Sequence, residues 1–455
     1  MTMNAQEPKP RTSLMVFTRD LRITDNPALS ASLKSNKTYC LFVFEDSLIS
    51  GPRPPLNRLK FLKDSLQDLA LSLRSIGGEL IIASGKWSDT VLDVAKKIHA
   101  SEINIADDYS TYATNRVNHL QNSCDINKIT LNKHSGISIV DPGVLAPATG
   151  SEYKIFTPYF RKWIDALWRP QAVLPKTFEF GKTDHQFPLS QETKDLLSIS
   201  SSGYGGETSG IKKMDQWLSK SSNTYNSTKD VPYLDSTSHL SAFLHFGCIS
   251  PLNLAIKAQS FRETENFVRQ LCWRDFFLQI LAVRPDASIN DYRNRNDIWT
   301  KDPESFSTWK EGKTGFPLVD AGMRQLIAEG FMHNRTRMVT ASFLVKDLYL
   351  DWRVGASHFM EHLIDGDIAN NQLGWQWVAG TGTDSNPHRI LNPIRQSERF
   401  DPSGSYIQKW VPELSGLTPK TIHDPPLAIR QQCGYPEQIV NHHDAVELFR
   451  NRRAS

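Results

Sequence analysis

Cysteine and long apolar runs are scarce in this 455-residue chain, and each scarcity excludes a class of protein. The five cysteines are scattered and no two form a Cys-x-x-Cys pair, so neither a metal site nor a disulfide framework is expected. No apolar run reaches membrane-spanning length, and residues 1–12 lack the apolar stretch of a secretory signal. These absences predict a cytoplasmic protein with no membrane partner.

A strong net charge and a dinucleotide-binding motif are missing too. The net charge of +3 excludes a basic coat, so any contact with nucleic acid must come from a local patch. No Gly-x-Gly-x-x-Gly follows the first β-rich run. The chain does have 11 tryptophans. Most of them are expected to pack in the core, so position must decide which ones do chemistry.

The first 140 residues alternate β-rich runs with amphipathic stretches. The β-rich runs are residues 14–17, 39–44, 80–83, 103–106 and 137–140. The helical stretches are residues 27–35, 56–76, 87–99 and 111–121. Strands that alternate with helices predict a Rossmann-like α/β domain with a parallel sheet, which we place at residues 12–142.

The character of the chain changes twice after this domain. Proline, serine and glycine gather between about residues 170 and 236, which is typical of a flexible linker, and we place the interdomain linker at residues 143–236. Helical spacing dominates afterwards, and Pro251 after Ser250 marks one helix start. The helical segments expected are residues 263–283, 317–329, 335–350 and 354–363. An all-α domain is therefore expected at residues 237–450.

Two helical stripes carry an unusual mixture of side chains. Gln270, Trp273, Arg274 and Phe277 share one face, which suits a cavity for a flat aromatic ligand or, equally, an arginine lying over core aromatics.

Asn334, Arg337 and Met338 share another face, which fits either a lined pocket or an ordinary amphipathic helix.

Two short polar motifs leave similar alternatives. Asp365 and Asp367 flank a glycine, an arrangement that fits a metal site or a simple turn, although the spacing is not that of an EF-hand. Thr237, Ser238 and Ser241 stand near an expected helix start, where they form either a phosphate cradle or an ordinary hydroxyl-rich cap.

Together and in this order, the motifs closely resemble the photolyase/cryptochrome family, and within it the class I photolyases that act on cyclobutane pyrimidine dimers. The resemblance runs from about residue 14 to residue 414. The matching strings are Phe17-Thr-Arg-Asp-Leu-Arg22, Asp25-Asn-Pro27, Thr237-Ser-His-Leu-Ser241, Trp273-Arg-Asp-Phe276, Gly312-Lys-Thr-Gly-Phe-Pro317, Met332-His-Asn-Arg335, Asp365-Gly-Asp367 and Gly374-Trp-Gln-Trp377.

The resemblance implies that the helical domain binds FAD. Residues 237–241 would hold the pyrophosphate, Arg337 would pair with Asp365 beside the flavin ring, and Asn371 would face flavin N5. The complete set of implied FAD-binding residues is Tyr225, Thr237, Ser238, His239, Leu240, Ser241, Phe267, Gln270, Arg274, Asn334, Arg337, Asp365, Gly366, Asp367 and Asn371.

The resemblance also implies light-driven repair of damaged DNA. Excited, reduced FAD would give an electron to a pyrimidine dimer flipped out of the stack, and the cyclobutane ring would split. Trp375, Trp352 and Trp299 match the electron-relay tryptophans of the family, and with Asn371 and Gln270 they are the implied catalytic residues. The implied contacts to the dimer and the DNA strand are Lys229, Gln270, Trp273, Asn334, Arg335, Met338, Trp377, Arg389 and Gln396.

Departures from the family pattern leave the lesion open. Gln270 stands where cyclobutane-dimer enzymes usually have glutamate, as in (6-4) photoproduct enzymes and animal-type cryptochromes. Asn334 and Met338 favour the cyclobutane lesion instead, because the (6-4) enzymes carry a histidine at the position of Asn334. A second departure is Phe267, where a tryptophan is familiar. We expect cyclobutane-dimer repair.

Three further questions stay open. A cryptochrome-type blue-light sensor is the competing function, although the chain leaves little room for a long tail after the last motif. A redox flavoprotein without DNA binding would not need Asn334, Arg335 and Trp377 together. A second antenna chromophore, whether deazaflavin, folate or flavin, would have Asp107 and Asp108 nearby if one is bound at all. We expect a monomer that binds no metal.

Overall fold

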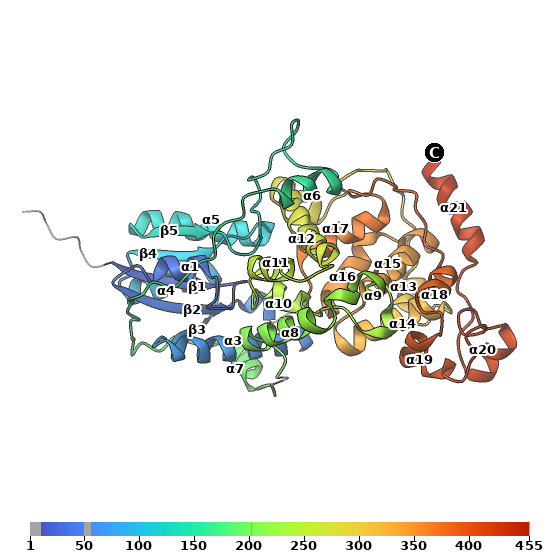
Figure 1. Cartoon of the computed structure of the whole chain (residues 1–455), viewed down its shortest axis with the longest axis horizontal. Coiled ribbons are helices and arrows are strands. Elements are labelled where there is room, and N and C mark those ends of the chain that lie inside the picture. Colours follow the sequence, from blue (N-terminus) through green and yellow to red (C-terminus); the bar gives the residue numbers. More distant parts are fainter. Residues whose placement is uncertain (1–10, 50–55, 202, 455) are drawn as a thin grey trace, which may run out of the picture. The chain divides into compact units, whose positions relative to one another are not determined.

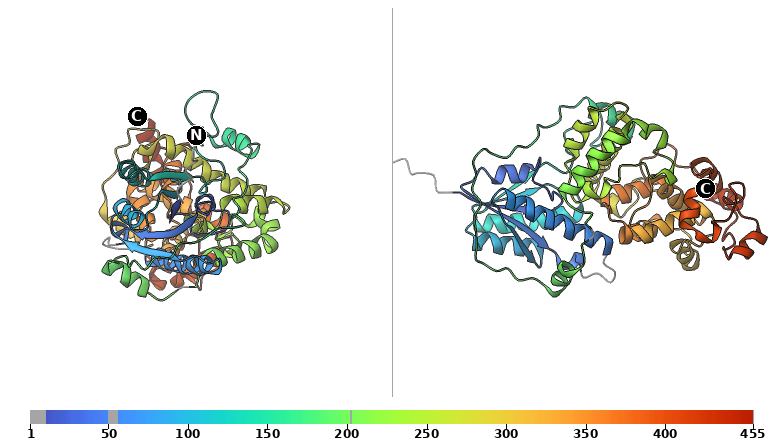
Figure 2. Two further views of the ribbon diagram at one scale, coloured as in Figure 1. Left: turned by 90° about the vertical axis from the view of Figure 1, so that its left-hand side faces the viewer. Right: turned by 60° about the horizontal axis from the view of Figure 1, so that its bottom comes forward.

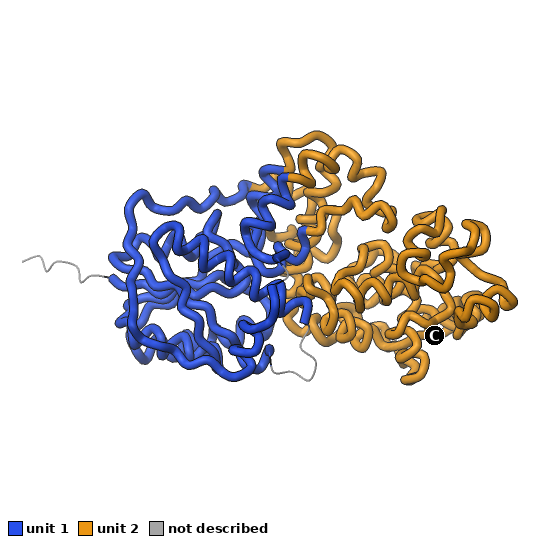
Figure 3. The backbone as a smooth tube through the Cα atoms, turned by 90° about the horizontal axis from the view of Figure 1, so that it is seen from below, with its two compact units in different colours: residues 1–141, 167–215, 240–257 blue, residues 142–166, 216–239, 258–455 orange. Residues whose placement is uncertain are grey.

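The computed structural model describes residues 11–49, 56–201 and 203–454, which form two compact units. Residues 1–141, 167–215 and 240–257 make the first unit, and residues 142–166, 216–239 and 258–455 make the second (Figure 3). Both units are assembled from separate stretches of the chain, and the domain limits given above stay a prediction. The expectation about a secretory signal rests mostly on residues 1–10, which lie outside the described residues.

A five-stranded parallel sheet forms the centre of the first unit (Figure 1). Its order is β3-β2-β1-β4-β5, which is the order of a doubly wound α/β fold and confirms the predicted fold class. The strands are β1 (Thr12–Phe17), β2 (Lys37–Phe44), β3 (Leu80–Ser84), β4 (Glu102–Ala106) and β5 (Thr130–His134).

Helices pack against this sheet because its strands are apolar on both faces (Figure 2). Leu14, Val16, Leu41 and Val43 alternate along β1 and β2 and share a core with apolar residues of α4 and α5. The helices that lie wholly in this unit are α1 (Pro27–Ser32), α2 (Asp46–Ile49), α3 (Leu56–Ser75), α4 (Trp87–Lys97), α5 (Thr111–Asn127), α7 (Gln191–Ser198) and α10 (Ser241–His245), and most of α11 (Pro251–Gln259) belongs to it as well.

The prediction of a strand at residues 137–140 is wrong. The fifth strand is Thr130–His134, which is polar and only half-buried because it lies at the edge of the sheet. Ile137, Ile139 and Val140 are buried but irregular in backbone. Their apolar character therefore reflects packing of a loop and not strand pairing.

The segment between about residues 170 and 236 is more ordered than the expected flexible linker. It contains α7, α8 (Glu207–Lys220) and α9 (Tyr225–Thr228). Glu207 also accepts hydrogen bonds from the backbone N–H groups of Ile23 and Thr24, at 2.8 and 3.0 Å. The serine and glycine cluster near residue 203 therefore marks only the break between α7 and α8.

The N-terminal family strings hold the first unit together. Arg22 is buried, and its guanidinium donates to the backbone carbonyls of Gly247, Asp25 and Gly136 at 2.9 Å. Gly247 has a φ of +67°, and a Cβ there would lie 1.9 Å from the carbonyl oxygen of Arg19. These residues are structural, since they tie the loop after β1 to the chain before α11.

The second unit is helical, as predicted for this part of the chain. Its core contains Trp309, Trp352 and Trp375. None of its helices, nor any other in the described part of the chain, is long and apolar enough to cross a membrane. The helices are α6 (Phe156–Ile164), α9, α12 (Glu265–Val283), α13 (Pro303–Lys310), α14 (Pro317–Glu329), α15 (Asn334–Ser342), α16 (Trp352–His362), α17 (Ile368–Ala379), α18 (Pro393–Phe400), α19 (Ser405–Trp410), α20 (Leu427–Cys433) and α21 (His442–Ala454).

The single helix expected at residues 335–350 is interrupted. It ends as an α-helix at Ser342 and continues as one π-helical turn, η4 (Phe343–Asp347). Lys346 is buried in this turn and donates to the carbonyls of Ala379 and Pro387, at 3.2 and 2.9 Å. Apolar spacing over five residues cannot distinguish a π-turn from an α-helix, so the sequence could not predict the interruption.

Candidate functional site

The mixed stripe of α12 contains a stacked tryptophan. The Trp273 ring lies against Phe156 of α6, with ring centroids 3.7 Å apart and 3° between the planes. Gln270 is exposed, and the mostly buried Arg274 lies 3.9 Å from the Asp275 carboxylate. Phe156 was not predicted, and it covers one face of the indole that the resemblance assigns to the dimer.

An aromatic cluster surrounds Tyr225. Its ring meets Trp217 and Phe267 edge to face, with centroids 5.5 and 5.7 Å apart. Burial raises the pKa of Tyr225 to about 12, so its hydroxyl stays protonated. Phe267, the departure from the family pattern, packs against Trp217 at 4.5 Å. The indole of Trp217 on α8 therefore lies next to position 267, where the family pattern has a tryptophan.

The stretch from Thr237 to Ser241 turns sharply in front of α10. His239 has a φ of +52°, unusual for a residue with a side chain, and its ring contacts Phe331 and Asp235. Thr237 and Ser238 are half-buried, whereas Leu240 is buried and Ser241 is exposed. The backbone therefore bends where the resemblance places a pyrophosphate.

The structure brings Arg337 and Asp365 together. The two side chains form an ion pair with an N–O distance of 2.9 Å, and Arg337 Nε also donates to the Met332 carbonyl at 2.7 Å. This pair was expected from the resemblance. Gly366, which follows Asp365, is buried.

Asp367 begins α17 as its N-cap. Its carboxylate accepts from the backbone N–H of Asn370 at 2.8 Å. In the Asp-Gly-Asp motif, one carboxylate is thus ion-paired and the other caps a helix. Asn371 donates from Nδ2 to the Ala356 carbonyl at 3.0 Å, which holds its side chain against α16.

The residues of the second unit fit a bound flavin by their donor chemistry. A flavin ring requires flat apolar contacts together with hydrogen-bond donors and a nearby cation. The ion pair of Arg337 with Asp365 supplies a charged partner that is only partly exposed, and the half-buried hydroxyls of Thr237 and Ser238 supply donors. The Asn371 amide adds a polar group between α16 and α17.

Trp375 is buried, with only 3% of its surface exposed. It packs edge to face against Phe359 at 4.9 Å and Trp309 at 6.1 Å. A Cβ on Gly355 would lie 2.3 Å from the Trp375 ring. Glycine at position 355 is therefore required for this indole to lie against α16.

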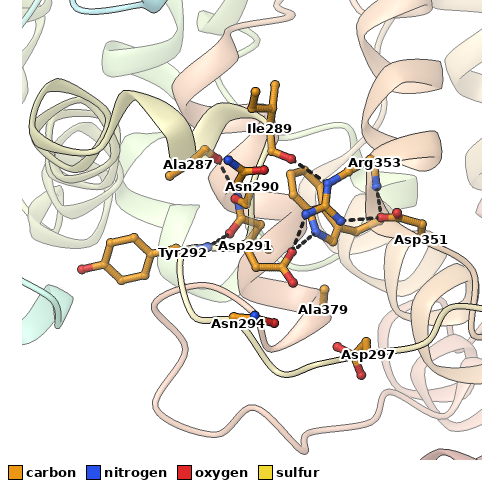
Figure 4. A network of polar contacts seen from close by, with 12 residues as sticks. Ala287, Ile289, Asn290, Asp291, Tyr292, Asn294, Asp297, Asp351, Arg353 and Ala379 are labelled. Carbon is orange, nitrogen blue, oxygen red and sulfur yellow. Dashed lines mark hydrogen bonds and ion pairs between the residues drawn. The ribbon is translucent and has the colours of Figure 1, made fainter.

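Trp352 has a carboxylate at its ring nitrogen. The indole Nε1 donates to Asp291 at 2.8 Å. Arg353 contacts the same Asp291 oxygen at 2.9 Å (Figure 4). Arg353 also pairs with Asp351 at 3.0 Å. A negative charge at the indole N–H favours a positive charge on that ring.

Trp299 lies near the surface of the same helical unit. It is half-buried and packs against the core that contains Trp352 and Trp375. Its ring meets Tyr349 at a centroid distance of 5.0 Å. All three tryptophans of the expected relay thus belong to one packed region.

The residues expected to contact DNA are only partly brought together. Asn334 Nδ2 lies 3.8 Å from Met338 Sδ, and the Arg389 guanidinium lies 5.2 Å from the Trp377 ring centroid. Lys229 lies over the Tyr225 ring at 5.8 Å.

Two of these residues have surroundings that sequence reasoning missed. Arg335 is paired with Asp230 at 2.7 Å and stacked over Phe400 at 4.1 Å. The half-buried Gln396 has a buried Oε1 atom without a hydrogen-bond partner among the described residues.

Fold and site define a flavoprotein with an α/β unit and a helical unit, and the comparisons identify the family. Residues 13–176 match the family described as DNA photolyase, and residues 267–455 match the FAD binding domain of DNA photolyase. The deoxyribodipyrimidine photo-lyase of Streptomyces griseus is 42% identical over 97% of this chain and 99% of its own length. This chain belongs to the DNA photolyase family, and FAD is its cofactor.

Two solved structures share the fold. The cryptochrome of Synechocystis superposes with a TM-score of 0.89 at 29% identity, over 98% of this chain and 99% of its own. An archaeal photolyase from Sulfolobus tokodaii with two FAD molecules has a TM-score of 0.87 at 29% identity, over 97% of this chain and 99% of its own. The two FAD molecules of that archaeal photolyase imply a novel light-harvesting cofactor in it.

Proposed function

We propose that this chain is a light-driven lyase that splits cyclobutane pyrimidine dimers in DNA. The observation that carries the proposal is the 42% identity with a deoxyribodipyrimidine photo-lyase over nearly the whole of both chains. Bound FAD, when reduced and excited by light, supplies the electron that opens the cyclobutane ring. The side chains of this protein orient the cofactor, receive the lesion and keep the strand in register.

The flavin side of the site is held by charge and hydrogen bonds. The ion pair of Arg337 with Asp365 fixes a cation beside the ring, and the Arg337 bond to the Met332 carbonyl limits how far that cation can move. The Asn371 amide, whose Nδ2 donates to the Ala356 carbonyl and to Gln372 Oε1, would offer a polar group to flavin N5. Residues 237–241 would hold the pyrophosphate at their turn.

The lesion side is lined by Asn334, Met338, Trp377 and Trp273. Asn334 and Met338 lie one helical turn apart on α15. The exposed Gln270 hydrogen-bonds the dimer with its neutral amide, which offers both a donor and an acceptor. Flipping a damaged pair out of the stack costs about a few kcal/mol, and apolar contacts in this pocket offset part of that cost.

The relay tryptophans return the cofactor to its reduced state. Trp375, Trp352 and Trp299 give a route through the helical core toward the surface. The Asp291 carboxylate at Trp352 Nε1 favours positive charge at the middle position, while the Arg353 guanidinium, 4.7 Å from the centroid of the same ring, opposes it.

Contacts to the DNA strand come from Lys229, Arg335, Arg389 and Gln396. Arg335 must break its ion pair with Asp230 before it can bind a DNA phosphate.

A second chromophore is bound by the α/β unit, as the two FAD molecules of the archaeal relative suggest, with Asp107 and Asp108 following β4 as candidates nearby. The protein acts as a monomer in the cytoplasm, in keeping with its scattered cysteines.

A blue-light sensor is the second candidate function, and the superposition on a cryptochrome favours it.

The test is an illuminated repair assay with the purified holoprotein. A duplex with one cyclobutane thymine dimer is incubated with the chemically reduced protein in light and in darkness, and intact thymines are counted. Repair that requires light supports the proposal. Flavin that photoreduces normally while the dimer remains in both samples contradicts repair and favours the sensor.

A further inference from the structure

The last turn of α16 carries three side chains with metal-ligating atoms. The sequence His358-Phe-Met-Glu361-His362 places them at positions i, i+3 and i+4, so they share one face of the helix. Two histidines at i and i+4 with a glutamate between them form an arrangement that binds zinc on helices of other proteins. The FAD and DNA contacts described above use none of the three.

The structure brings these groups into one cluster. One ligand atom from each residue lies within 4.8 Å of the other two. His358 Nδ1 is 3.9 Å from Glu361 Oε2, and the two imidazole rings are 4.6 Å apart between centroids. Ligand atoms of a tetrahedral zinc site are separated by about 3.3 Å, so small side-chain rotations would close the cluster on an ion.

His358 is the buried member of the cluster. It is only 6% exposed, and its Nε2 atom has no hydrogen-bond partner among the described residues. The ring nitrogen of His358 that faces Glu361 is Nδ1, so Nδ1 is the atom that would ligate an ion at this cluster. Glu361 is exposed and His362 is half-buried, so an ion can reach the cluster from solvent.

We propose that His358, Glu361 and His362 form a binding site for a divalent transition-metal ion, and that Zn²⁺ suits this donor set best. Two imidazoles and one carboxylate leave a fourth position for water. The charge of Lys310 acts on His358 and opposes binding, while the Glu361 carboxylate favours it. This proposal is independent of the proposed repair activity, because it requires neither FAD nor DNA.

The place of the site in the fold gives the ion a structural role. His362 ends α16 three residues before Asp365, which pairs with Arg337. A metal bound to the last turn of α16 would hold the start of residues 363–365, the segment that leads to Asp365. The His358 ring also lies 5.7 Å from the buried Trp309 ring, so a paramagnetic ion at the site would quench tryptophan fluorescence.

Zn²⁺ titration of the holoprotein tests the proposal. The affinity tag is removed, the protein is treated with chelator, and ZnCl₂ is added in a calorimeter. We expect one Zn²⁺ per chain, and a parallel CoCl₂ titration should give the visible difference bands of a low-coordinate site. Because His358 is buried, its replacement risks unfolding, so the test variants are the more accessible Glu361→Gln and His362→Ala. Each should weaken binding about tenfold or more.

The matched control is His443→Ala. His443 is a fully solvated histidine beside a carboxylate, Asp444 at 3.8 Å, but it is not part of the cluster. This variant should bind Zn²⁺ as the wild type does, and all variants should retain bound FAD. The proposal is overturned if no Zn²⁺ binds, if Glu361→Gln and His362→Ala bind it unchanged, or if His443→Ala weakens binding as much as His362→Ala.

Discussion

Trp375 is the residue whose replacement should separate photoreduction from repair. Trp375→Phe keeps an aromatic ring between Phe359 and Trp309 but removes the readily oxidised indole. We expect light-driven reduction of oxidised FAD to fall at least about tenfold, because an indole radical cation is lost from the route. Repair by chemically reduced protein should be unchanged within a factor of about two. Flash absorption and the repair assay measure the two rates.

Trp410→Phe is the control for this experiment. Trp410 packs against the same core but is not in the proposed relay, so its replacement should leave photoreduction as in the wild type. Equal photoreduction in Trp375→Phe and the wild type would exclude Trp375 from the relay.

Individual contacts differ in how far the sequence could predict them. The pairing of Arg337 with Asp365 followed from the family resemblance, and the structure contains it. The pairing of Arg335 with Asp230 did not, because the carboxylate stands 105 residues earlier and no spacing rule connects the two positions. The cluster of His358 and its neighbours had a signal in the chain, the helical i, i+3, i+4 spacing, which sequence analysis overlooked.

At the scale of elements, the start of α15 should make stability depend on pH. His333 is the N-cap of this helix, accepting from the Arg335 N–H at 3.1 Å, and burial lowers its pKa to about 4. Between pH 6.5 and 4 the unfolded chain binds a proton that the folded protein does not. The free energy of unfolding therefore decreases as the pH falls through this range, by up to about 3 kcal/mol.

His333→Asn isolates this effect, because asparagine keeps a capping oxygen and cannot titrate. Urea denaturation of both proteins is measured between pH 7 and 4. The stability of the wild type relative to the variant should decline toward pH 4. Parallel curves for the two proteins across this range would exclude His333 as the source of the dependence.

Elements with strong periodic signals were predicted, and those fixed by tertiary contacts were not. Four strands and the helix Pro317–Glu329 follow from apolar spacing and a proline start. The edge strand Thr130–His134 carries no such signal, since each of its residues is exposed or only half-buried. The π-turn of Lys346 depends on carbonyls of Ala379 and Pro387, which its own sequence cannot specify.

At the scale of the whole molecule, a net charge of +3 makes DNA binding depend on a few cations. Arg335→Gln should reduce the slope of log K against log salt by about 1, since one phosphate contact is lost. Asp230→Asn should tighten binding to damaged duplex, because Arg335 no longer has to leave a carboxylate. Fluorescence anisotropy over a salt series measures both effects.

Lys97→Gln is the control, because Lys97 forms a comparable ion pair with Asp93 on α4 of the other unit. It should leave affinity and salt slope unchanged. Weaker binding by Asp230→Asn, or a slope for Arg335→Gln equal to that of the wild type, would show that Arg335 does not contact the strand.

The most direct test of the central claim compares two lesions under identical light. Chemically reduced holoprotein receives one duplex with a cyclobutane thymine dimer and one with a (6-4) photoproduct, and restored thymines are counted in each. Asn334 and Met338 on α15 predict repair of the cyclobutane dimer and none of the (6-4) product, despite glutamine at position 270. Repair of the (6-4) product alone would contradict the account and make Gln270 the residue that defines the lesion.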